Sequence, residues 1–269
     1  MKRLVSNIIR YLRLYFVLAK LSIMSVVIYR TNSLFMVITP LVWIATVVVF
    51  ISIILGDGGS IGGWNYWEMI SLLGIHELIF LGSWFLFIGN LNRFIREINL
   101  GKFDRILLRP VNHRFLVSFN SVDLTTIAGI LNAFLMFFFS LAKLKVDISL
   151  EKWLLFLISF FSAYLILYFI YFLVCSLSLF FINAETFADW LIEATDFDRY
   201  PAEIYSNLFR FFLLFFLPIL FFAYVPTAIL LNKLPGYFAI LGLMMVAWFY
   251  LISTFIWRSG LKRYQSASS

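Results

Sequence analysis

The chain has 269 residues, of which 63% are hydrophobic and only 13% are charged, and its formal net charge is +7. A soluble domain carries roughly 25% charged residues, so a soluble fold is excluded and lipid is expected to cover most of the apolar surface. One cysteine and two histidines argue against a disulfide framework and against a His/Cys metal site.

Six segments have the length and composition of membrane spans, since a helix needs about 20 mostly apolar residues to cross a bilayer. They lie at about residues 34–55, 67–91, 123–144, 153–181, 205–225 and 237–257. The sequence therefore predicts an all-α integral membrane protein of six transmembrane helices, with residues 1–269 as a single transmembrane domain. Pro40 and Pro218 are expected to kink their spans, because each removes a backbone hydrogen-bond donor.

Residues 1–30 precede the first span and are basic. Residues 4–20 place apolar side chains on one side of a helix and arginines elsewhere, which predicts an amphipathic helix lying in the membrane interface. The apolar side consists of Ile8, Ile9, Leu12, Tyr15, Phe16 and Ala19.

The second span contains two ionisable residues, His76 and Glu77, at a depth where such groups are rare. They are candidates for a substrate path or a proton relay, and the alternative is a polar pair hydrogen-bonded to a neighbouring helix. Adjacent positions on a helix differ by 100°, so the two do not share one face. A stripe of small residues on the same span predicts close packing of another helix. The stripe consists of Ser71, Gly74, Gly82 and Gly89.

Residues 92–117 form a basic cytoplasmic segment between the second and third spans. The second helix is expected to continue to about Ile98, with Asn99 and Gly101 as its stop signal. Asp104 is expected to cap a further short helix that Pro110 ends. The residues leave two interpretations open, an ordinary positively charged loop or a short coupling helix that binds a partner.

Residues 183–203 form an acidic segment that is expected to be an amphipathic cytoplasmic helix. One face carries carboxylates and the opposite face is apolar. The acidic face consists of Glu185, Asp189, Glu193 and Asp196, and the apolar face of Phe187, Trp190, Leu191 and Ala194. The following span, 205–225, is rich in phenylalanine, and most of these side chains are expected to face lipid or a partner subunit.

The distribution of Lys and Arg predicts the orientation in the membrane. With six spans, seventeen of these residues fall on the side that holds both termini and four on the other. Both termini are therefore predicted to be cytoplasmic. The positive charge follows the membrane, so it is not interpreted as a nucleic-acid signal.

The basic segment also resembles a known family. It contains Arg96-Glu97, then Gly101-Lys102-Phe103-Asp104, and then Leu107-Leu108-Arg109-Pro110-Val111-Asn112. This run resembles the cytoplasmic G-x-hydrophobic-D-x-x-L-L-R-P motif of one group of ABC type-2 export permeases. A second stretch is similar to the same group. It consists of Arg199-Tyr200-Pro201, Ile204-Tyr205, Pro218 and Tyr224-Val225-Pro226.

The resemblance extends over nearly the whole chain and implies the membrane permease subunit of an ATP-driven exporter in a bacterial cytoplasmic (inner) membrane. It implies two copies of a separate ATPase subunit, which bind ATP and Mg²⁺, and a second permease chain, identical or homologous. By the same resemblance the ATPase-coupling residues are Gly101, Phe103, Asp104, Arg105, Leu107, Leu108, Arg109 and Pro110. The acidic face of 185–196 is a departure from the family pattern.

No ATP site is expected in the chain itself, and it is not expected to be an enzyme. Its one Gly-Lys pair, Gly101-Lys102, is followed by Phe103 where a phosphate loop has Ser or Thr. No cofactor, metal or nucleic acid is expected. Three other functions stay open: a proton-coupled secondary transporter that uses Glu77, an intramembrane enzyme, which the few His and Cys residues disfavour, and a membrane scaffold.

Overall fold

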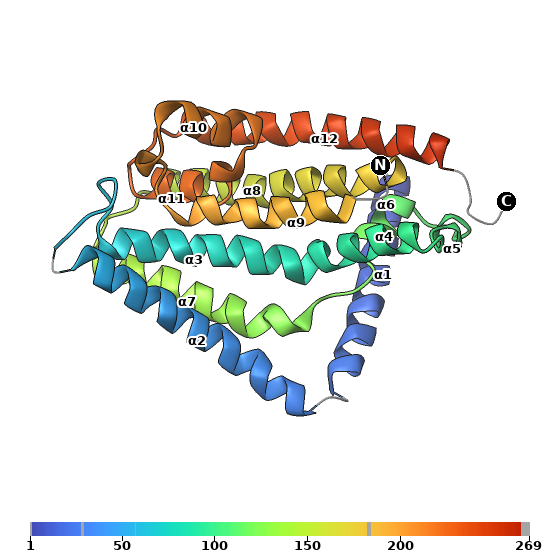
Figure 1. Cartoon of the computed structure of the whole chain (residues 1–269), viewed down its shortest axis with the longest axis horizontal. Helices are drawn as coiled ribbons and strands as arrows, with labels where there is room; N and C mark the ends of the chain where they lie inside the picture. The colour runs from blue at the N-terminus through green and yellow to red at the C-terminus, as the bar shows by residue number, and fades with distance from the viewer. Residues whose placement is uncertain (1, 28–29, 57, 182–183, 265–269) are drawn as a thin grey trace.

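The computed structural model describes residues 2–27, 30–56, 58–181 and 184–264. Regular structure in these ranges is helical, apart from one isolated bridge between Ile61 and Trp64. Five long helices lie side by side as a bundle, and α1 crosses one end of it (Figure 1). The bundle helices are α2 (Arg30–Leu55), α3 (Tyr66–Ser83), α7 (Ile127–Leu144), α8 (Leu150–Ser176) and α12 (Tyr237–Arg263), and α1 is Lys2–Val27.

Shorter elements connect and extend the bundle helices. The π-helix η1 (Trp84–Ile88) joins α3 to α4 (Gly89–Asn99), so that the helix of the second span continues to Asn99, close to the end predicted at about Ile98. The connection between α4 and α7 holds α5 (Asp104–Leu107), α6 (His113–Ser118) and η2 (Leu124–Thr126). Between α8 and α12 lie η3 (Leu177–Leu179), α9 (Ala184–Ala194), η4 (Thr195–Arg199), η5 (Ala202–Ile204), α10 (Asn207–Phe211), η6 (Phe212–Phe216), η7 (Ile219–Phe221) and α11 (Tyr224–Leu230).

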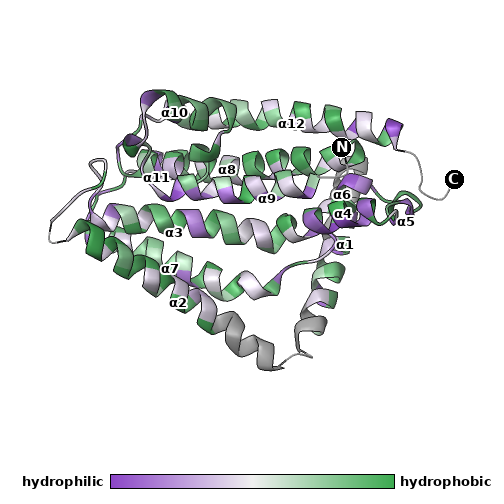
Figure 2. Cartoon of the chain, in the orientation of Figure 1, coloured by the Kyte–Doolittle hydropathy of each residue, from purple (hydrophilic) through white to green (hydrophobic). Residues whose placement is uncertain are grey.

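Five helical stretches of the described chain are long and apolar enough to cross a membrane. They are Ile38–Leu55, Tyr66–Asn99, Leu124–Leu144, Leu150–Leu179 and Tyr237–Arg263. Hydrophobic residues run along the length of the bundle, while hydrophilic residues gather at the end that holds α4 and α5 (Figure 2). The all-α membrane fold is thereby confirmed, but six continuous spans are not.

The predicted fifth span, 205–225, is not one helix. The π-helix η6 ends at Phe216, Leu217 leaves the helical region at φ −119° and ψ 82°, and Pro218 begins a short 3-10 turn. Proline removes a backbone donor and its ring clashes with the preceding turn, which accounts for a break where the sequence predicted only a kink. The chain from α9 to α11, Ala184–Leu230, crosses from one end of the bundle to the other in short pieces and is called the broken segment below (Figure 1).

Helix α3 forms the centre of the bundle, because every residue from Met69 to Ile79 is buried. It begins with a capping box, in which Asn65 and Glu68 bond each other's backbone N–H groups. A Cβ on Gly74 would lie 2.9 Å from the backbone nitrogen of Phe137, so the missing side chain lets α7 approach closely. A Cβ on Gly82 would likewise meet the Tyr164 hydroxyl, so the close packing predicted for the small-residue stripe is confirmed at Gly74 and Gly82. At Gly89 a Cβ would meet nothing within 4 Å.

Helix α1 has the long amphipathic form that was predicted, and it lies across the bundle end (Figure 1). Tyr11 packs on Phe115 of α6, with ring centroids 4.8 Å apart, and Tyr15 packs edge-on against Phe119. Phe16, by contrast, is exposed. The side chains of Ile8, Ile9 and Leu12 lie outside the described residues.

The acidic segment differs from its prediction. Helix α9 begins beside the end of α8 and runs back along it, so that η4 contacts the middle of α3. Its buried face is formed by Ala184, Ala188 and Leu191, while Phe187 and Trp190 are exposed together with the acidic residues. One face of α9 therefore packs against the bundle through small side chains, while the rest of its surface is exposed.

Candidate functional site

The predicted coupling segment begins with a sharp helix stop. Helix α4 ends at Asn99, and Gly101 has φ +65°, a left-handed conformation that glycine adopts without strain. The Gly101 N–H donates to the Ile98 carbonyl at 2.9 Å, and the Lys102 N–H donates to the Glu97 carbonyl at 2.8 Å. This pair of bonds is a Schellman motif and confirms the predicted stop.

A buried phenylalanine holds the segment against the bundle. Phe103 is fully buried and lies 5.2 Å from Phe94 of α4 and 6.3 Å from Trp257 of α12, measured between ring centroids. The short helix α5 then spans only Asp104–Leu107. Asp104 is its first residue and not its cap, since Phe103 occupies the N-cap position without a side-chain bond.

The last part of the segment is open to solvent. Leu108 is 84% exposed, and Arg105, Arg109 and Pro110 are exposed as well. Helix α5 ends before Pro110, as predicted. An exposed leucine between arginines, fixed to the bundle by Phe103, forms a firmly held surface on which another protein can dock.

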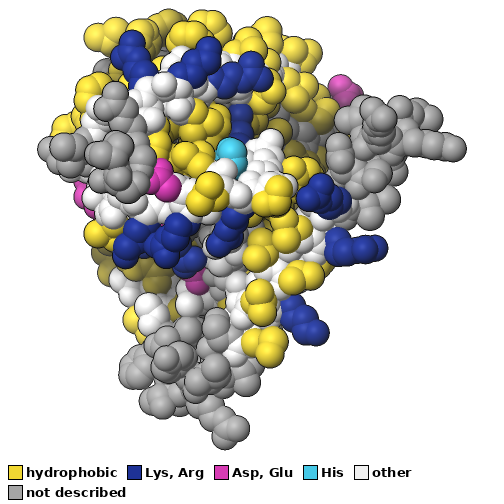
Figure 3. Space-filling view, turned by 90° about the vertical axis from the view of Figure 1, so that its right-hand side faces the viewer, with side chains coloured by type: hydrophobic (Ala, Val, Ile, Leu, Met, Phe, Trp, Pro, Cys, Tyr) yellow, Lys and Arg dark blue, Asp and Glu magenta, His cyan; other side chains and the backbone are white. Residues whose placement is uncertain are grey.

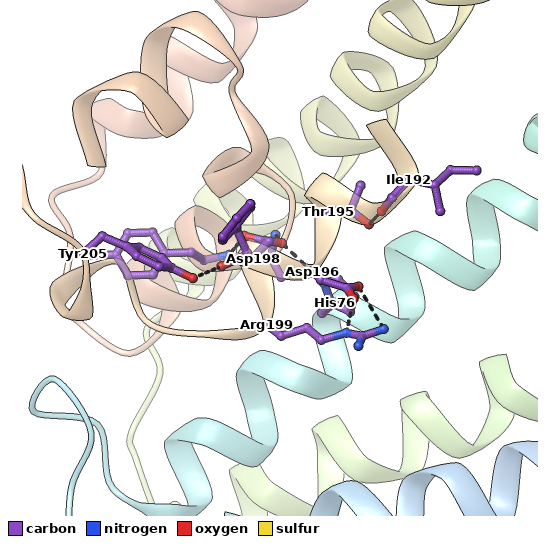
Figure 4. A network of polar contacts seen from close by, with 10 residues as sticks. His76, Ile192, Thr195, Asp196, Asp198, Arg199 and Tyr205 are labelled. Atoms are coloured by element: carbon purple, nitrogen blue, oxygen red, sulfur yellow. Dashed lines mark hydrogen bonds and ion pairs between the residues drawn. The ribbon is translucent and has the colours of Figure 1, made fainter. Parts of the chain in front are cut away.

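A polar network lies in the middle of the bundle, where η4 meets α3 (Figure 4). His76 is ten residues beyond the start of α3, about 15 Å along a helix, which is near the centre of a hydrocarbon layer about 30 Å thick. The Nε of Arg199 donates to Nε2 of His76 at 3.2 Å, and the Nδ1 of His76 lies 3.7 Å from Oδ2 of Asp198. Arg199 also forms an ion pair of 3.2 Å with Asp196.

These contacts define the state of the imidazole. A ring nitrogen that accepts a hydrogen bond carries no proton, so His76 is neutral with its proton on Nδ1, facing Asp198. The Asp198 carboxylate accepts the backbone N–H groups of Ala223 and Tyr224 at the start of α11. A carboxylate at a helix start satisfies free N–H groups and the helix dipole, so Asp198 stabilises the broken segment on both of its sides.

Glu77 belongs to the same region although it points from another face of α3. Its Oε1 accepts the indole N–H of Trp43 at 3.1 Å, and the Arg199 guanidinium lies 5.2 Å from the centre of that indole ring. His76 is 2% exposed and Glu77 is 7% exposed. Arg199 thus contacts both faces of α3: it bonds His76 directly, and it lies on the Trp43 ring that bonds Glu77.

A further polar cluster joins the broken segment to the end of the bundle that lies opposite the coupling segment. Glu203 accepts the indole N–H of Trp64 at 3.1 Å and the hydroxyl of Tyr224 at 2.7 Å. Lys233, in the turn before α12, lies 3.0 Å from Glu68 and donates to the Gly63 carbonyl. The charged residues in and around the broken segment therefore join it to α3 at mid-bundle and at this end.

Sequence reasoning found part of this site. It singled out His76 and Glu77 on α3, and it missed that Asp198 and Arg199 are their partners. Those two residues were placed in the cytoplasmic acidic segment, because their local sequence is polar and shows no apolar span. The one signal in the sequence is the run Arg199-Tyr200-Pro201, which resembles the family pattern but carries no stated role there.

A comparison with protein families bears on both regions. A family model described as ABC-2 family transporter protein matches residues 41–268. No curated protein and no solved structure matches the chain. The matched residues include the coupling segment, the polar network and all five apolar helical stretches except the first residues of one. The chain therefore belongs to the ABC-2 family of transporter proteins.

Proposed function

We propose that this protein is the permease subunit of an ATP-driven ABC exporter, forms half of the translocation path and couples to a separate ATPase. The working complex then holds two permease chains, identical or homologous, and two ATPase copies that bind ATP and Mg²⁺. The protein lies in a bacterial cytoplasmic membrane with both termini on the cytoplasmic side. It needs no cofactor of its own.

One observation carries the proposal beyond family membership. The segment Gly101–Pro110 lies at the end of the bundle next to α1 and presents Leu108 and Arg109 outward from a buried anchor. Lys and Arg side chains gather on this end of the molecule, with hydrophobic side chains between them (Figure 3). A projecting, rigidly held segment transmits the movement of a docked ATPase to the spans that continue from it.

The distribution of Lys and Arg residues supports the proposed orientation, in which both termini are cytoplasmic. Arg199 lies at mid-bundle, and Arg210 donates to the Ala202 carbonyl in the broken segment, so neither belongs with the cytoplasmic residues with which it was counted. Fifteen of the 21 Lys and Arg residues still lie before the first span, in 92–117 or after residue 257. The positive surplus therefore remains on one side.

The acidic face of α9 supports a second permease chain. The exposed carboxylates lie on α9, which runs along the spans, and on the following η4; they are Glu185, Asp189 and Glu193 on α9 and Asp196 on η4. Ionised carboxylates are not stable against lipid and face a water-filled cavity or another protein chain. We infer that this face, rather than the buried His76 and Glu77, lines the path between two permease chains.

The first experiment identifies the partners. The tagged protein is extracted from its host in mild detergent, and the proteins that accompany it are determined by mass spectrometry. The expected result is an ATPase with a phosphate loop in stoichiometric amount. A protein that emerges alone and monodisperse would contradict the proposal.

The coupling residues are tested in the same complex. Leu108→Ala and Arg109→Ala are expected to weaken ATPase binding at least tenfold, with unchanged thermal unfolding of the permease, because both side chains are exposed. Arg258→Ala, on an exposed position at the end of α12, is the matched control. ATPase binding that is unchanged in all three variants would contradict the coupling role of this segment.

A Glu77-dependent proton transporter predicts a different outcome. In that case Glu77→Gln abolishes proton-coupled flux in liposomes that contain no ATPase. Our proposal expects no such flux in the unaltered protein, because the indole N–H of Trp43 donates a hydrogen bond to the Glu77 carboxylate and holds it in place.

A further inference from the structure

An open cavity of about 560 Å³ lies between α1, α6 and α8. This volume is within the range of about 300–1,000 Å³ that small-molecule sites occupy. Its walls are mainly aromatic and include Tyr11, Tyr15, Phe115, Phe119 and Tyr168. Arg114 is the one charged residue among its lining residues. The cavity includes none of the predicted coupling residues Gly101–Pro110 and none of the polar network around His76.

Arg114 is surrounded by rings and hydroxyl groups. Its guanidinium carbon lies 4.2 Å from the ring centre of Phe172, and its Nη1 donates to the Thr254 hydroxyl at 2.8 Å. Its Nη2 donates to the Ser253 hydroxyl at 3.3 Å. A guanidinium has about five N–H donors in all, so donors remain for a further acceptor.

The positive charge of Arg114 has no negative partner in the part of the chain that the structure describes. The ion pairs found there join His76 to Asp198, Arg199 to Asp196 and Lys233 to Glu68. A charge that is partly removed from water is costly unless an opposite charge or hydrogen bonds compensate it. Cation–π contacts and two neutral hydroxyls compensate only in part, which leaves this position suited to an anion.

A second polar group lines the same cavity without a partner. The Tyr15 hydroxyl is buried and makes no hydrogen bond to any described residue. Burial raises the pKa of Tyr15, so the hydroxyl keeps its proton and can donate it. Arg114 and Tyr15 thus both line one apolar cavity, and the enclosed Tyr15 hydroxyl is a donor that becomes available to a ligand when the Tyr15 side chain turns toward the cavity.

The position of the cavity indicates the kind of anion. One wall is α1, a basic amphipathic helix of the type that lies at the level of lipid headgroups. The lining is almost entirely apolar around a single cation, which suits a ligand with a hydrocarbon chain and a phosphate. Free phosphate would leave the aromatic walls without a partner.

We propose that this cavity binds an anionic phospholipid of the inner leaflet, with its acyl chain against the aromatic walls and its phosphate on Arg114 and the Tyr15 hydroxyl. The bound lipid fills the space between α1 and the bundle and thereby stabilises the docking of α1. The proposal does not depend on the transported substrate.

The test uses the purified full chain in detergent and native mass spectrometry. Phosphatidylglycerol is titrated against phosphatidylcholine with the same acyl chains, and inorganic phosphate is compared by thermal unfolding. The unaltered protein is expected to bind phosphatidylglycerol at least tenfold more tightly than phosphatidylcholine. Arg114→Gln is expected to lose this preference, while Arg96→Gln, an exposed position on α4, keeps it.

Three results would overturn the proposal. They are equal binding of the two lipids by the unaltered protein, a preference that survives Arg114→Gln, and a thermal stabilisation by inorganic phosphate equal to that by phosphatidylglycerol. The third result would indicate a soluble phosphate ligand. If Arg114→Gln does not fold, Arg114→Lys and Tyr15→Phe are each expected to weaken phosphatidylglycerol binding severalfold, and unchanged affinity in both would overturn the proposal too.

Discussion

Single residues decide whether the broken segment stays in place. Asp198 is fully buried, accepts two N–H groups at the start of α11 and faces the protonated nitrogen of His76. Asp196 lies two positions earlier and is 57% exposed, with only an ion pair to Arg199. Two neighbouring carboxylates of the same acidic segment therefore have different physical roles.

This difference leads to a prediction on stability. Asp198→Ala leaves buried N–H groups without an acceptor and is expected to cost about 1–3 kcal/mol of unfolding free energy. Asp196→Ala removes an exposed ion pair, which contributes about 0–1 kcal/mol. Thermal unfolding in detergent, followed by tryptophan fluorescence, compares the two. An equal loss in both variants would contradict the capping role of Asp198.

Helix packing depends on glycine at one position of α3. Gly74→Val is expected to destabilise the protein by about 1–3 kcal/mol, since overpacking forces backbone shifts and the new Cβ would lie 2.9 Å from the nitrogen of Phe137. Gly89→Ala is the control, because a Cβ there meets nothing within 4 Å. The unfolding temperature of the two variants in the same detergent is the measurement. A Gly74→Val protein as stable as the control would mean that α3 and α7 pack less closely than described.

At the scale of elements, the coupling segment combines a fixed part and a free part. The Schellman motif at Gly101 and the burial of Phe103 fix its start, while Leu108 to Pro110 project from it. Stability and docking should therefore respond to different residues of one short stretch.

Phe103→Ala is expected to lower both stability and ATPase binding. Loss of a buried phenylalanine costs about 3–5 kcal/mol, so the unfolding temperature is expected to fall, and ATPase binding should fall with it because the segment loses its anchor. Leu108→Ala is expected to affect binding alone. A Phe103→Ala protein with unchanged stability would show that the ring contacts with Phe94 and Trp257 do not hold the segment.

At the scale of the whole molecule, one monomer leaves a polar face exposed among its spans. The carboxylates of α9 need water or a second chain, whereas the exposed apolar residues of α10 and η6, such as Leu208 and Phe216, suit lipid or a partner. This contrast between a polar and an apolar exposed face agrees with the proposed path along α9, at the contact between two permease chains.

Cysteine labelling tests this arrangement. In a Cys175→Ala background, Glu193→Cys is expected to react with a membrane-impermeant maleimide at least tenfold faster than Phe161→Cys. Both positions are exposed in the monomer, but Phe161 lies on the apolar span α8. The reaction is followed in membrane vesicles by mass shift. Equal labelling of the two positions would mean that no aqueous path reaches α9.

The sequence by itself determined the class of the protein, because hydropathy over a window of about 20 residues is a local property. It likewise placed the helix stop at Gly101 and the close packing at Gly74, which depend on neighbouring residues or on the absence of a side chain. It could not determine that the fifth span is broken, or that Asp198 and Arg199 meet His76. Those contacts join residues more than 120 positions apart, and a polar segment enters an apolar bundle only when the tertiary structure supplies partners for its charges.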